Sequence, residues 1–308
     1  MKILVTGGAG FIGSHLVDRL VEAEHEVTVL DNLYRGRQEN IQKHLQAQSI
    51  QFYQSDIRNF QEIEGHFKNL NAVFHLAAQS NVMGAVQDVD YSFYTNVVGT
   101  YNVLKACQQH NVPRLIFTSS REAYGEARYL PVGENHPLDS KNTYGASKVA
   151  GEKYCQVFQN MGALQVVILR LANVYGERDF DRVIPIFLNN VFKKQDIHIY
   201  GGQQIIDFVS VEIVVEALIQ SLFNDEALAG PTNVGSGKGT TLFDLANRIM
   251  ELTRAESQVV VDPPRSVEVV KFTADVTRFK QIFNVNLNDD PLYYLPKMIE
   301  ILKYEQDD

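Results

Sequence analysis

The stretch KILVTGGAGFIG, residues 2–13, decides the fold of this chain. It begins with the unbroken apolar run ILV, which is typical of a strand buried on both faces of a parallel sheet. Three glycines follow where a helix over residues 14–24 is expected to begin: Gly7, Gly10 and Gly13, with Gly8 as the start of an alternative G-x-G-x-x-G. Residues without a Cβ let backbone N–H groups and the positive end of a helix approach a diphosphate closely. The sequence therefore predicts a nucleotide-binding turn at the start of an α/β domain.

An acidic residue ends the second expected strand, residues 27–30 (VTVL). Asp31 lies eighteen residues beyond Gly13, where a carboxylate can accept both hydroxyls of an adenosine ribose. This placement favours NAD over NADP. Arg35 and Arg37 are candidates for holding a 2′-phosphate, but loop arginines are usually only solvated. We therefore expect NAD.

Composition excludes several kinds of partner. The 308 residues are 45% hydrophobic and 21% charged, as in an ordinary globular protein, and they suffice for one large domain or two lobes. The net charge of −9 argues against a nucleic acid or an anionic membrane as a partner. The sequence contains no apolar run of membrane-spanning length and no signal-type segment after Met1, so we expect a cytoplasmic protein.

The cysteines and histidines have structural interpretations. Cys107 and Cys155 are far apart and outside any C-x-x-C pair, which indicates two buried thiols. The eight histidines include no H-E-x-x-H and no carboxylate cluster, so we expect no metal site. His75 lies within an expected strand over residues 72–76 and is interpreted as a core histidine with satisfied hydrogen bonds.

Strands and helices alternate along the first half of the chain. Further strands are expected over residues 50–53, 72–76, 114–117 and 165–169, and helices over 96–109 and 144–161. This alternation predicts a Rossmann-type doubly wound parallel sheet. The alternation becomes irregular after Gly176. We therefore expect a NAD-binding domain over residues 1–176 and a smaller α/β substrate lobe over residues 177–308.

Polar residues follow the strand over residues 114–117, at the edge of the sheet where ligands bind. A helix then opens with Tyr144, and Lys148 lies four residues later on the same helix face, an ammonium beside a phenol. Residues 101–105 and 293–297 show the same Y-x-x-x-K spacing, but neither follows a hydroxyl-rich strand end. Tyr144 and Lys148 are therefore the catalytic candidates.

Other residues at this edge are candidates for cofactor contacts. Ala77 and Ala78 follow the strand over residues 72–76, and small residues suit a close approach of the backbone to a cofactor. Asp56 has two interpretations that the sequence does not separate. It either faces the adenine amino group or serves as the N-cap of the next helix.

Together these features resemble the extended short-chain dehydrogenase/reductases, and within them the NAD-dependent nucleotide-sugar epimerases and dehydratases. The motifs that carry the resemblance are TGGAGFIG, Asp31 with Asn32, HLAAQ, the serine-rich strand end before YG, Y-x-x-x-K and R-x-x-N-V-Y-G. They run in order along nearly the whole chain, and the match is weaker after Gly176. The NAD contacts that the resemblance implies are Gly7, Gly10, Phe11, Ile12, Gly13, Asp31, Asn32, Asp56, Ile57, Leu76, Ala77, Ala78, Tyr144 and Lys148.

The resemblance also implies chemical roles. Tyr144 would be the acid/base, Lys148 its electrostatic partner, and Ser120 a hydrogen-bond partner of the sugar hydroxyl. A tyrosine with an ordinary pKa of about 10 is a poor base, but a nearby ammonium and a positive nicotinamide both favour the phenolate. Hydride would then pass from the sugar to NAD and return to the other face of a transient 4-ketosugar. The implied substrate contacts are Ser120, Asn173, Arg182, the backbone around Ile184, and Arg265, which could instead be a solvated charge.

The chain departs from the family pattern at several positions. Ile206 stands where an arginine usually grips the diphosphate. Glu122 matches sugar 4,6-dehydratases and UDP-glucuronate decarboxylases better than 4-epimerases and is a further catalytic candidate. Arg121 replaces the acid that dehydratases use to protonate a leaving hydroxyl, and an arginine cannot donate that proton. Phe180 replaces a cation of uronate epimerases, which favours an uncharged hexose.

The resemblance therefore favours a nucleotide-sugar 4-epimerase with a UDP-hexose substrate. A decarboxylase or 4,6-dehydratase is the alternative, and a non-catalytic NAD-binding sensor is less favoured because Tyr144 and Lys148 are both present. The resemblance also implies a homodimer that pairs the helices beginning near Asn96 and Tyr144.

Overall fold

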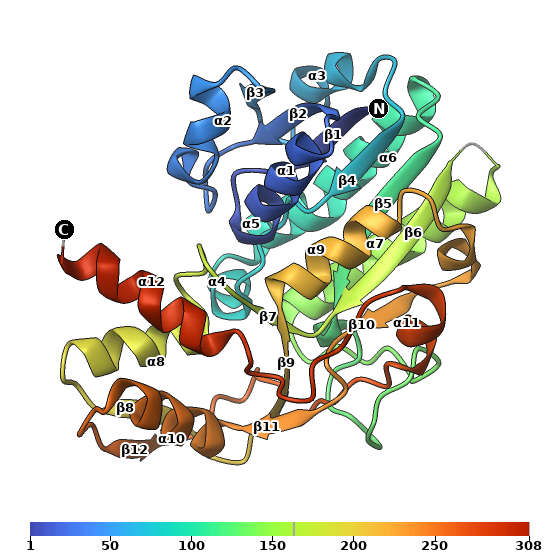
Figure 1. Ribbon diagram of the computed structural model, residues 1–308. Coiled ribbons are helices and arrows are strands. Elements are labelled where there is room, and N and C mark those ends of the chain that lie inside the picture. Colours follow the sequence, from blue (N-terminus) through green and yellow to red (C-terminus); the bar gives the residue numbers. More distant parts are fainter. Residues whose placement is uncertain (163, 308) are drawn as a thin grey trace.

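The computed structural model describes residues 1–162 and 164–307, which form a doubly wound α/β fold (Figure 1). Seven parallel strands make its central sheet, in the order β10-β6-β5-β4-β1-β2-β3. In chain order they are β1 (Lys2–Thr6), β2 (Glu26–Asp31), β3 (Ile50–Gln54), β4 (Ala72–His75), β5 (Arg114–Ser120), β6 (Gln165–Leu171) and β10 (Thr232–Val234). The chain reverses its direction of winding between β1 and β4, where such folds bind ligands at the carboxyl ends of the strands. The predicted Rossmann-type sheet is confirmed.

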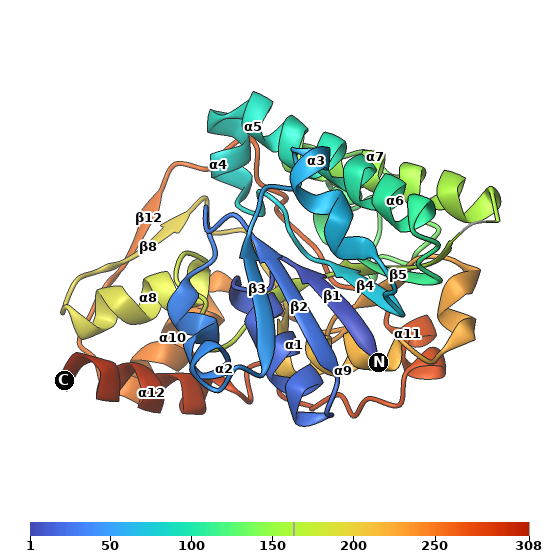
Figure 2. The ribbon, with the colours of Figure 1, turned by 90° about the horizontal axis from the view of Figure 1, so that it is seen from above.

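Alternate residues of β1 pack against opposite layers of helices, because successive side chains of a strand point to opposite faces. The covering helices are α1 (Phe11–Glu22), α6 (Gly99–Gln109), α7 (Thr143–Asn160) and α9 (Val211–Gln220). Ile3 and Val5 belong to a core cluster with α1 and α9, whereas Leu4 belongs to a cluster with α6 and α7. Figure 2 shows these two pairs of helices on opposite sides of the sheet. The apolar run ILV thus reflects burial on both faces.

Two predicted elements differ at their ends. Helix α1 begins at Phe11, because Gly10 caps it and the Gly10 carbonyl oxygen already accepts a hydrogen bond from the Ser14 N–H. Strand β5 continues to Ser120, because its pairing with β6 persists until Ser120 lies opposite Leu171. The hydroxyl residues of this segment therefore belong to the strand and share its rigidity.

The rest of the chain forms a smaller layer below the sheet in Figure 1. Its strands are β7 (Asn173–Tyr175), β8 (Ile197–Tyr200), β9 (Ile205–Ser210), β11 (Gly239–Thr241) and β12 (Val259–Asp262), arranged as β11-β9-β7 and β12-β8. Helices α8 (Val183–Phe192), α10 (Leu242–Thr253) and α12 (Leu295–Asp307) share a separate apolar core with these strands. Short helices complete the fold: α2 (Gln42–Gln46), α3 (Phe60–Ile63), α4 (Val82–Gln87), α5 (Val89–Phe93) and α11 (Thr277–Ile282).

Two elements beyond residue 176 return to the central sheet. Strand β10 pairs with β6 and covers its edge, with Asn233 opposite Arg170, and α9 packs against α1. A division at residue 176 therefore does not separate two continuous units. The irregular alternation after Gly176 arises because the chain passes between the two layers more than once.

Groups interpreted as structural are buried. Cys107 and Cys155 are free and fully buried, and burial raises the pKa of both thiols. The ring nitrogens of His75 lie 2.8 Å from Thr6 Oγ1 and 2.9 Å from Thr100 Oγ1, which confirms a satisfied core histidine. Within residues 1–162 and 164–307, no helix is long and apolar enough to cross a membrane. The same residues contain no group of three or more His, Cys, Asp or Glu placed to hold a metal ion.

Candidate active site

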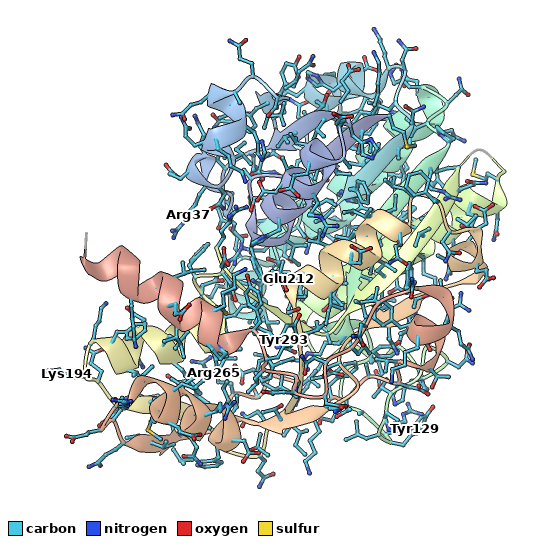
Figure 3. All side chains as sticks on the ribbon, in the orientation of Figure 1. Arg37, Tyr129, Lys194, Glu212, Arg265 and Tyr293 are labelled. Carbon is cyan, nitrogen blue, oxygen red and sulfur yellow. The ribbon has the colours of Figure 1, made fainter. Side chains whose placement is uncertain are left out.

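A cavity of about 700 Å³ lies at the carboxyl ends of the central strands and extends to the smaller lobe. The predicted site residues that line it are Gly7, Gly10, Phe11, Ile12, Gly13, Asp31, Asn32, Ile57, Leu76, Ala77, Ala78, Ser120, Glu122, Tyr144, Lys148, Asn173, Arg182 and Arg265. Figure 3 shows Arg265 in the smaller lobe, below Arg37 of the loop that follows β2. Residues from both ends of the chain thus meet in one cavity.

The turn after β1 excludes side chains at two of its glycines. Gly7 adopts φ +74°, and a Cβ there would lie 2.7 Å from the backbone nitrogen of Ala77. A Cβ on Gly13 would lie 2.1 Å from the carbonyl oxygen of Gly7, because α1 passes so close to the turn. At Gly10 the nearest atom would be 3.2 Å away, so packing tolerates a side chain there better. This cavity-lining backbone fits the diphosphate of a dinucleotide.

Asp31 occupies the predicted ribose position at the end of β2. One carboxylate oxygen accepts a hydrogen bond from the Ala9 N–H at 3.0 Å, and the other accepts one from the Leu33 N–H at 2.9 Å. Burial raises the pKa of this carboxyl, and the two hydrogen bonds oppose the rise. Each oxygen keeps a lone pair for a ribose hydroxyl, so the site fits the adenosine ribose of NAD.

The two arginines of the loop after β2 are engaged by other loops. Arg35 Nη2 lies 2.8 Å from each carboxylate oxygen of Asp181, and Asn81 Nδ2 donates to the same carboxylate at 3.0 Å. The guanidinium carbon of Arg37 lies 4.1 Å from the centre of the Phe180 ring. Arg35 is thus paired with a carboxylate, and Arg37 does not line the cavity, which again fits NAD. We call Arg35, Asn81 and Asp181 the loop clasp, because they join the loops after β2, β4 and β7.

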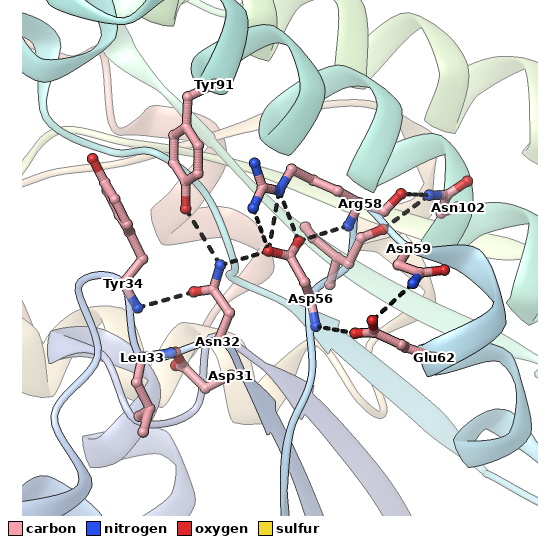
Figure 4. A network of polar contacts seen from close by, with 11 residues as sticks. Asp31, Asn32, Leu33, Tyr34, Asp56, Arg58, Asn59, Glu62, Tyr91 and Asn102 are labelled. Carbon is pink, nitrogen blue, oxygen red and sulfur yellow. Dashed lines mark hydrogen bonds and ion pairs between the residues drawn. The ribbon is translucent and has the colours of Figure 1, made fainter.

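Asp56 does not line the cavity, contrary to the sequence prediction. Its carboxylate accepts hydrogen bonds from the Arg58 guanidinium at 2.7–3.0 Å and from Asn32 Nδ2 at 3.0 Å (Figure 4). Burial acts to raise the pKa of Asp56, but these hydrogen bonds outweigh it and hold that pKa below its usual range. The alternative interpretation is also wrong, since Asn59 is the residue that precedes helix α3. Asp56 instead fixes Asn32.

An aromatic pair that the sequence did not predict borders this end of the cavity. The ring centres of Tyr34 and Tyr91 lie 4.3 Å apart, and Asn32 joins them by accepting from the Tyr34 N–H and donating to the Tyr91 hydroxyl (Figure 4). Flat rings at this place suit contact with a planar base. Tyr34 lies in the loop after β2 and Tyr91 on α5, so no sequence motif unites them.

The catalytic candidates meet where β5 ends and α7 begins. Asn142 caps α7, because its Oδ1 accepts a hydrogen bond from the Gly145 N–H at 2.8 Å and so fixes the turn that carries Tyr144. One turn later, Lys148 Nζ donates to the Thr118 carbonyl oxygen at 2.8 Å and lies 5.8 Å from the centre of the Tyr144 ring. The ammonium has two further N–H donors for cofactor hydroxyls.

Burial controls the titration of this pair. It raises the pKa of Tyr144, while the Ser120 hydroxyl and the positive charge of Arg182 act in the opposite direction. Burial lowers the pKa of Lys148 to about 8. For Tyr144 the loss of hydration outweighs the neighbouring protein charges.

Ser120 and Glu122 are fixed by their own neighbours. Ser120 Oγ accepts a hydrogen bond from the Glu122 N–H at 3.2 Å, so the hydroxyl proton stays available for donation into the cavity. The Glu122 carboxylate is buried between Arg121 Nη2 at 2.9 Å and Asn142 Nδ2 at 2.7 Å. Both carboxylate oxygens therefore already have donors.

A buried network built on one ion pair connects α7 to the neighbouring strands of the central sheet. Glu152 on α7 pairs with the Arg170 guanidinium of β6 at 2.7 and 2.9 Å and accepts a hydrogen bond from the Ser119 hydroxyl. Arg170 also donates to the Tyr124 hydroxyl, which in turn donates to Asn233 of β10. All five side chains are buried. The network therefore joins α7, which carries Tyr144 and Lys148, to strands β5, β6 and β10.

The predicted substrate residues Ser120, Asn173, Arg182 and Arg265 all line the cavity. Asn173 Oδ1 is buried and has no hydrogen-bond partner within residues 1–162 and 164–307. Arg182 Nη1 donates to Asp179 at 2.8 Å, and its guanidinium carbon lies 5.4 Å from the centre of the Phe11 ring in the glycine-rich turn. The Ile184 side chain is buried in the core of the smaller lobe, whereas Val183, the residue before it on α8, lines the cavity, so a contact through the backbone around Ile184 stays a prediction.

The diphosphate arginine that the family usually has is replaced by an apolar contact. Ile206 is buried on β9. Arg265 lies nearby on the cavity wall, with its guanidinium carbon 3.6 Å from the centre of the Tyr200 ring and Nη1 3.1 Å from Glu268. This ordered stacking and pairing are not those of a freely solvated side chain.

The fold and the site define a class of protein: an enzyme that binds a dinucleotide at a glycine-rich turn and holds a tyrosine, a lysine and a serine beside it. The chain belongs to the NAD dependent epimerase/dehydratase family, whose profile matches residues 3–235. It is 38% identical to the putative UDP-glucose 4-epimerase of Methanocaldococcus jannaschii, over 91% of this chain and 92% of that protein.

Solved structures agree with this assignment. The UDP-glucose 4-epimerase of Thermotoga maritima with UDP-glucose superposes with a TM-score of 0.93 at 33% identity, over 99% of this chain and 100% of that one. A dTDP-glucose 4,6-dehydratase of Streptomyces venezuelae with NAD and TYD bound has the same TM-score at 25% identity, over 100% and 98% of the chains. UDP-glucuronic acid decarboxylases are similar as well. The protein is therefore an NAD-dependent enzyme, and its relatives carry out more than one reaction.

Proposed function

We propose that the protein is a nucleotide-sugar 4-epimerase that acts on a UDP-hexose through a transient 4-ketosugar. One observation carries the proposal: Ser120, Tyr144 and Lys148 line the cavity that the glycine-rich turn also lines. These are the groups needed to move a proton from a secondary alcohol while its carbon is oxidised. The epimerases among the relatives support the same choice.

In the proposed reaction, Tyr144 takes the proton of the C4 hydroxyl and later returns it. The Ser120 hydroxyl donates its proton to the same oxygen, while the Glu122 N–H donates to the Ser120 oxygen and orients the hydroxyl group. The Lys148 charge stabilises the phenolate and is held in place by the Thr118 carbonyl oxygen. Bound NAD supplies the redox chemistry, because it accepts a hydride from C4 and gives it back on the other face. No external oxidant is consumed.

Arg182 and Arg265 are the cations proposed to meet the substrate diphosphate in place of the residue missing at position 206. Both line the cavity, and each is paired with an acid in the free protein, Arg182 with Asp179 and Arg265 with Glu268. A diphosphate would take hydrogen bonds from both guanidinium groups. Asn173, with its unpartnered Oδ1, lies in the same wall as a polar contact for the nucleotide.

The test is interconversion of nucleotide sugars by the NAD-loaded enzyme. UDP-glucose and UDP-galactose, and then their N-acetyl forms, are incubated separately and followed by NMR. We expect one equilibrium mixture to be reached from either side. Tyr144→Phe should reduce the rate by about a hundredfold or more while NAD binding is retained. No interconversion of any of these sugars would disprove the proposal.

A decarboxylase or dehydratase is the second candidate, because Glu122 lines the cavity and the negative charge of Glu122 acts on the pKa of Tyr144. Against it, both Glu122 oxygens already have donors, so the carboxylate would have to give up an existing partner to accept a proton from the substrate. Mass spectrometry of the products separates the reactions, since epimerisation alone conserves the mass of the sugar. Loss of carbon dioxide or of water would replace the epimerase proposal.

We further propose that two copies of the protein pair through α6 and α7. The outward residues Tyr101, Tyr154, Val157 and Met161 are exposed, and the Tyr101 ring contacts Tyr154, so an apolar stripe crosses both helices. Apolar surface of this kind marks an interface. Val157→Asp should yield a monomer in light scattering, whereas Phe223→Asp, a change at an exposed residue outside the stripe, should not. A monomeric wild-type protein would contradict the proposal.

A further inference from the structure

Arg121 is a largely buried cation that neither the cofactor contacts nor the proton transfer uses. It follows Ser120 directly, lines the same cavity as Tyr144, and has a side chain that is 12% exposed. Its guanidinium carbon lies 5.8 Å from the centre of the buried Phe272 ring, which limits its movement on that side. A buried arginine at this place requires a reason, because desolvating a cation is costly.

Glu122 pairs with only one nitrogen atom of the Arg121 guanidinium. Arg121 Nη2 pairs with Glu122 at 2.9 Å, and Asn142 occupies the other carboxylate oxygen. Arg121 Nη1 is buried and has no hydrogen-bond partner among the described residues. A buried donor without an acceptor costs free energy until something accepts its hydrogen bond.

The position of the pair relates Arg121 to the sugar. Asn142 connects the pair to the catalytic helix, because its Nδ2 donates to Glu122 while its Oδ1 caps the turn that carries Tyr144. In the proposed reaction the C4 hydroxyl meets Tyr144, so we expect Arg121 to face the substituents beside C4, namely the C3 hydroxyl and the C6 hydroxyl carried on C5. Both are neutral oxygen acceptors in an uncharged hexose.

We propose that Arg121 is a specificity-determining residue whose free Nη1 donates to a hydroxyl flanking C4 of the sugar. The inference rests on the proposed function. Because Glu122 neutralises the guanidinium, the ion pair has no net charge, but Arg121 Nη1 can still donate a hydrogen bond in a fixed direction. It therefore selects a neutral hydroxyl and disfavours a carboxylate at C6, which would have to share Arg121 with Glu122.

The experiment measures kcat/KM of Arg121→Met and wild type for three NAD-dependent epimerisations. UDP-galactose carries both flanking hydroxyls, UDP-L-arabinose lacks C6, and UDP-3-deoxygalactose lacks the C3 hydroxyl. With UDP-galactose we expect a loss of about ten- to a hundredfold, mostly in KM, since the bond is made in the ground state and the transition state alike. The loss should disappear with whichever analogue lacks the accepting hydroxyl, and this identifies it.

Glu122→Gln tests whether the negative charge of Glu122, which neutralises Arg121, is what disfavours a carboxylate at C6. It keeps a side chain of the same size but leaves the Arg121 charge unbalanced, so the ratio of kcat/KM for UDP-galacturonate over UDP-galactose should rise about tenfold or more. An unchanged or lower ratio would overturn this part of the inference. If Arg121→Met does not fold, Arg121→Lys serves instead, because it retains a cation for Glu122 but loses the planar fork.

The outcomes separate this inference from the proposed function. If wild type converts none of the sugars, the proposed function fails before any variant is compared. If wild type is active and Arg121→Met loses the same factor with all three sugars, Arg121 is only structural and the inference is wrong. The same holds if the variant loses nothing. NAD binding and thermal unfolding of each variant show whether the fold is intact.

Discussion

The third glycine of the turn after β1 should be required for packing, and the second for the cofactor. In Gly13→Ala the new Cβ would lie 2.1 Å from the Gly7 carbonyl oxygen and 2.8 Å from Gly8 Cα. Both are backbone atoms, so α1 itself would have to move by more than 1 Å. In Gly10→Ala the nearest atom is 3.2 Å away and φ is −77°, which alanine adopts without strain.

The two variants should therefore fail in different ways. Overpacking against rigid atoms costs about 1–3 kcal/mol, and the preference of alanine for a helix returns at most about 1 kcal/mol in Gly13→Ala. Because the 2.1 Å approach puts the overpacking cost near its upper end, the net loss is about 2 kcal/mol, and the NAD-free variant should melt roughly 4–8 °C below wild type. Gly10→Ala should cost the NAD-free protein less, about 0.5–1 kcal/mol, because glycine is preferred over alanine at an N-cap. Its NAD affinity should fall, because the added methyl group occupies space beside the diphosphate.

The assay is thermal unfolding of NAD-free protein together with a titration of NAD. Gly65→Ala is the matched control, because a Cβ at Gly65 would meet no atom within 4 Å. The reasoning is refuted if Gly13→Ala melts like the control without NAD, or if Gly10→Ala binds NAD as tightly as wild type.

Three further predictions concern buried or paired charges. Burial lowers the pKa of His75 to about 3, so between its ordinary pKa of 6.5 and this value the unfolded chain binds more protons, and stability falls on acidification by up to about 1.4 kcal/mol per pH unit. In His75→Gln the urea midpoint should therefore change less than in wild type between about pH 7 and pH 5, and an equal change would contradict this. Arg35→Ala opens the loop clasp and should speed NAD release about tenfold in stopped-flow measurements, whereas Arg19→Ala, at an exposed ion pair, should not. Glu152→Gln leaves Arg170 without its carboxylate and should cost about 3 kcal/mol or more in urea unfolding, and a loss under about 1 kcal/mol would refute the importance of this pair.

Local patterns predicted the sheet and the cofactor turn because those features depend on nearby residues. The run ILV identifies a doubly buried strand, and the glycine spacing identifies a turn in which a Cβ on Gly10 or Gly13 would meet atoms of the motif itself. The helix that carries Tyr144 and Lys148 was predictable for the same reason, since four residues make one turn. The family resemblance then supplied the chemistry.

Features that depend on distant partners were not predictable. The sequence leaves Asp56 between an adenine contact and an N-cap, because nothing in it shows that Arg58 and Asn32 donate to this carboxylate. The direction of the Tyr144 pKa shift depends on how deeply the phenol is buried, which a helix pattern cannot give. The loop clasp joins residues more than a hundred positions apart, and Arg35 alone looks like a free loop arginine.

The arginines of the cavity are all paired with carboxylates. Arg35, Arg121, Arg182 and Arg265 line the cavity, and each forms an ion pair with an acidic side chain. Pairing avoids the cost of an isolated buried cation. If Arg182 and Arg265 meet a diphosphate as proposed, the diphosphate must compete with Asp179 and Glu268, so only a ligand that offers better hydrogen-bond geometry is favoured. Selectivity at this site would therefore depend on how well a ligand replaces the carboxylates as hydrogen-bond partners of the arginines, more than on the attraction of its charge to the cavity.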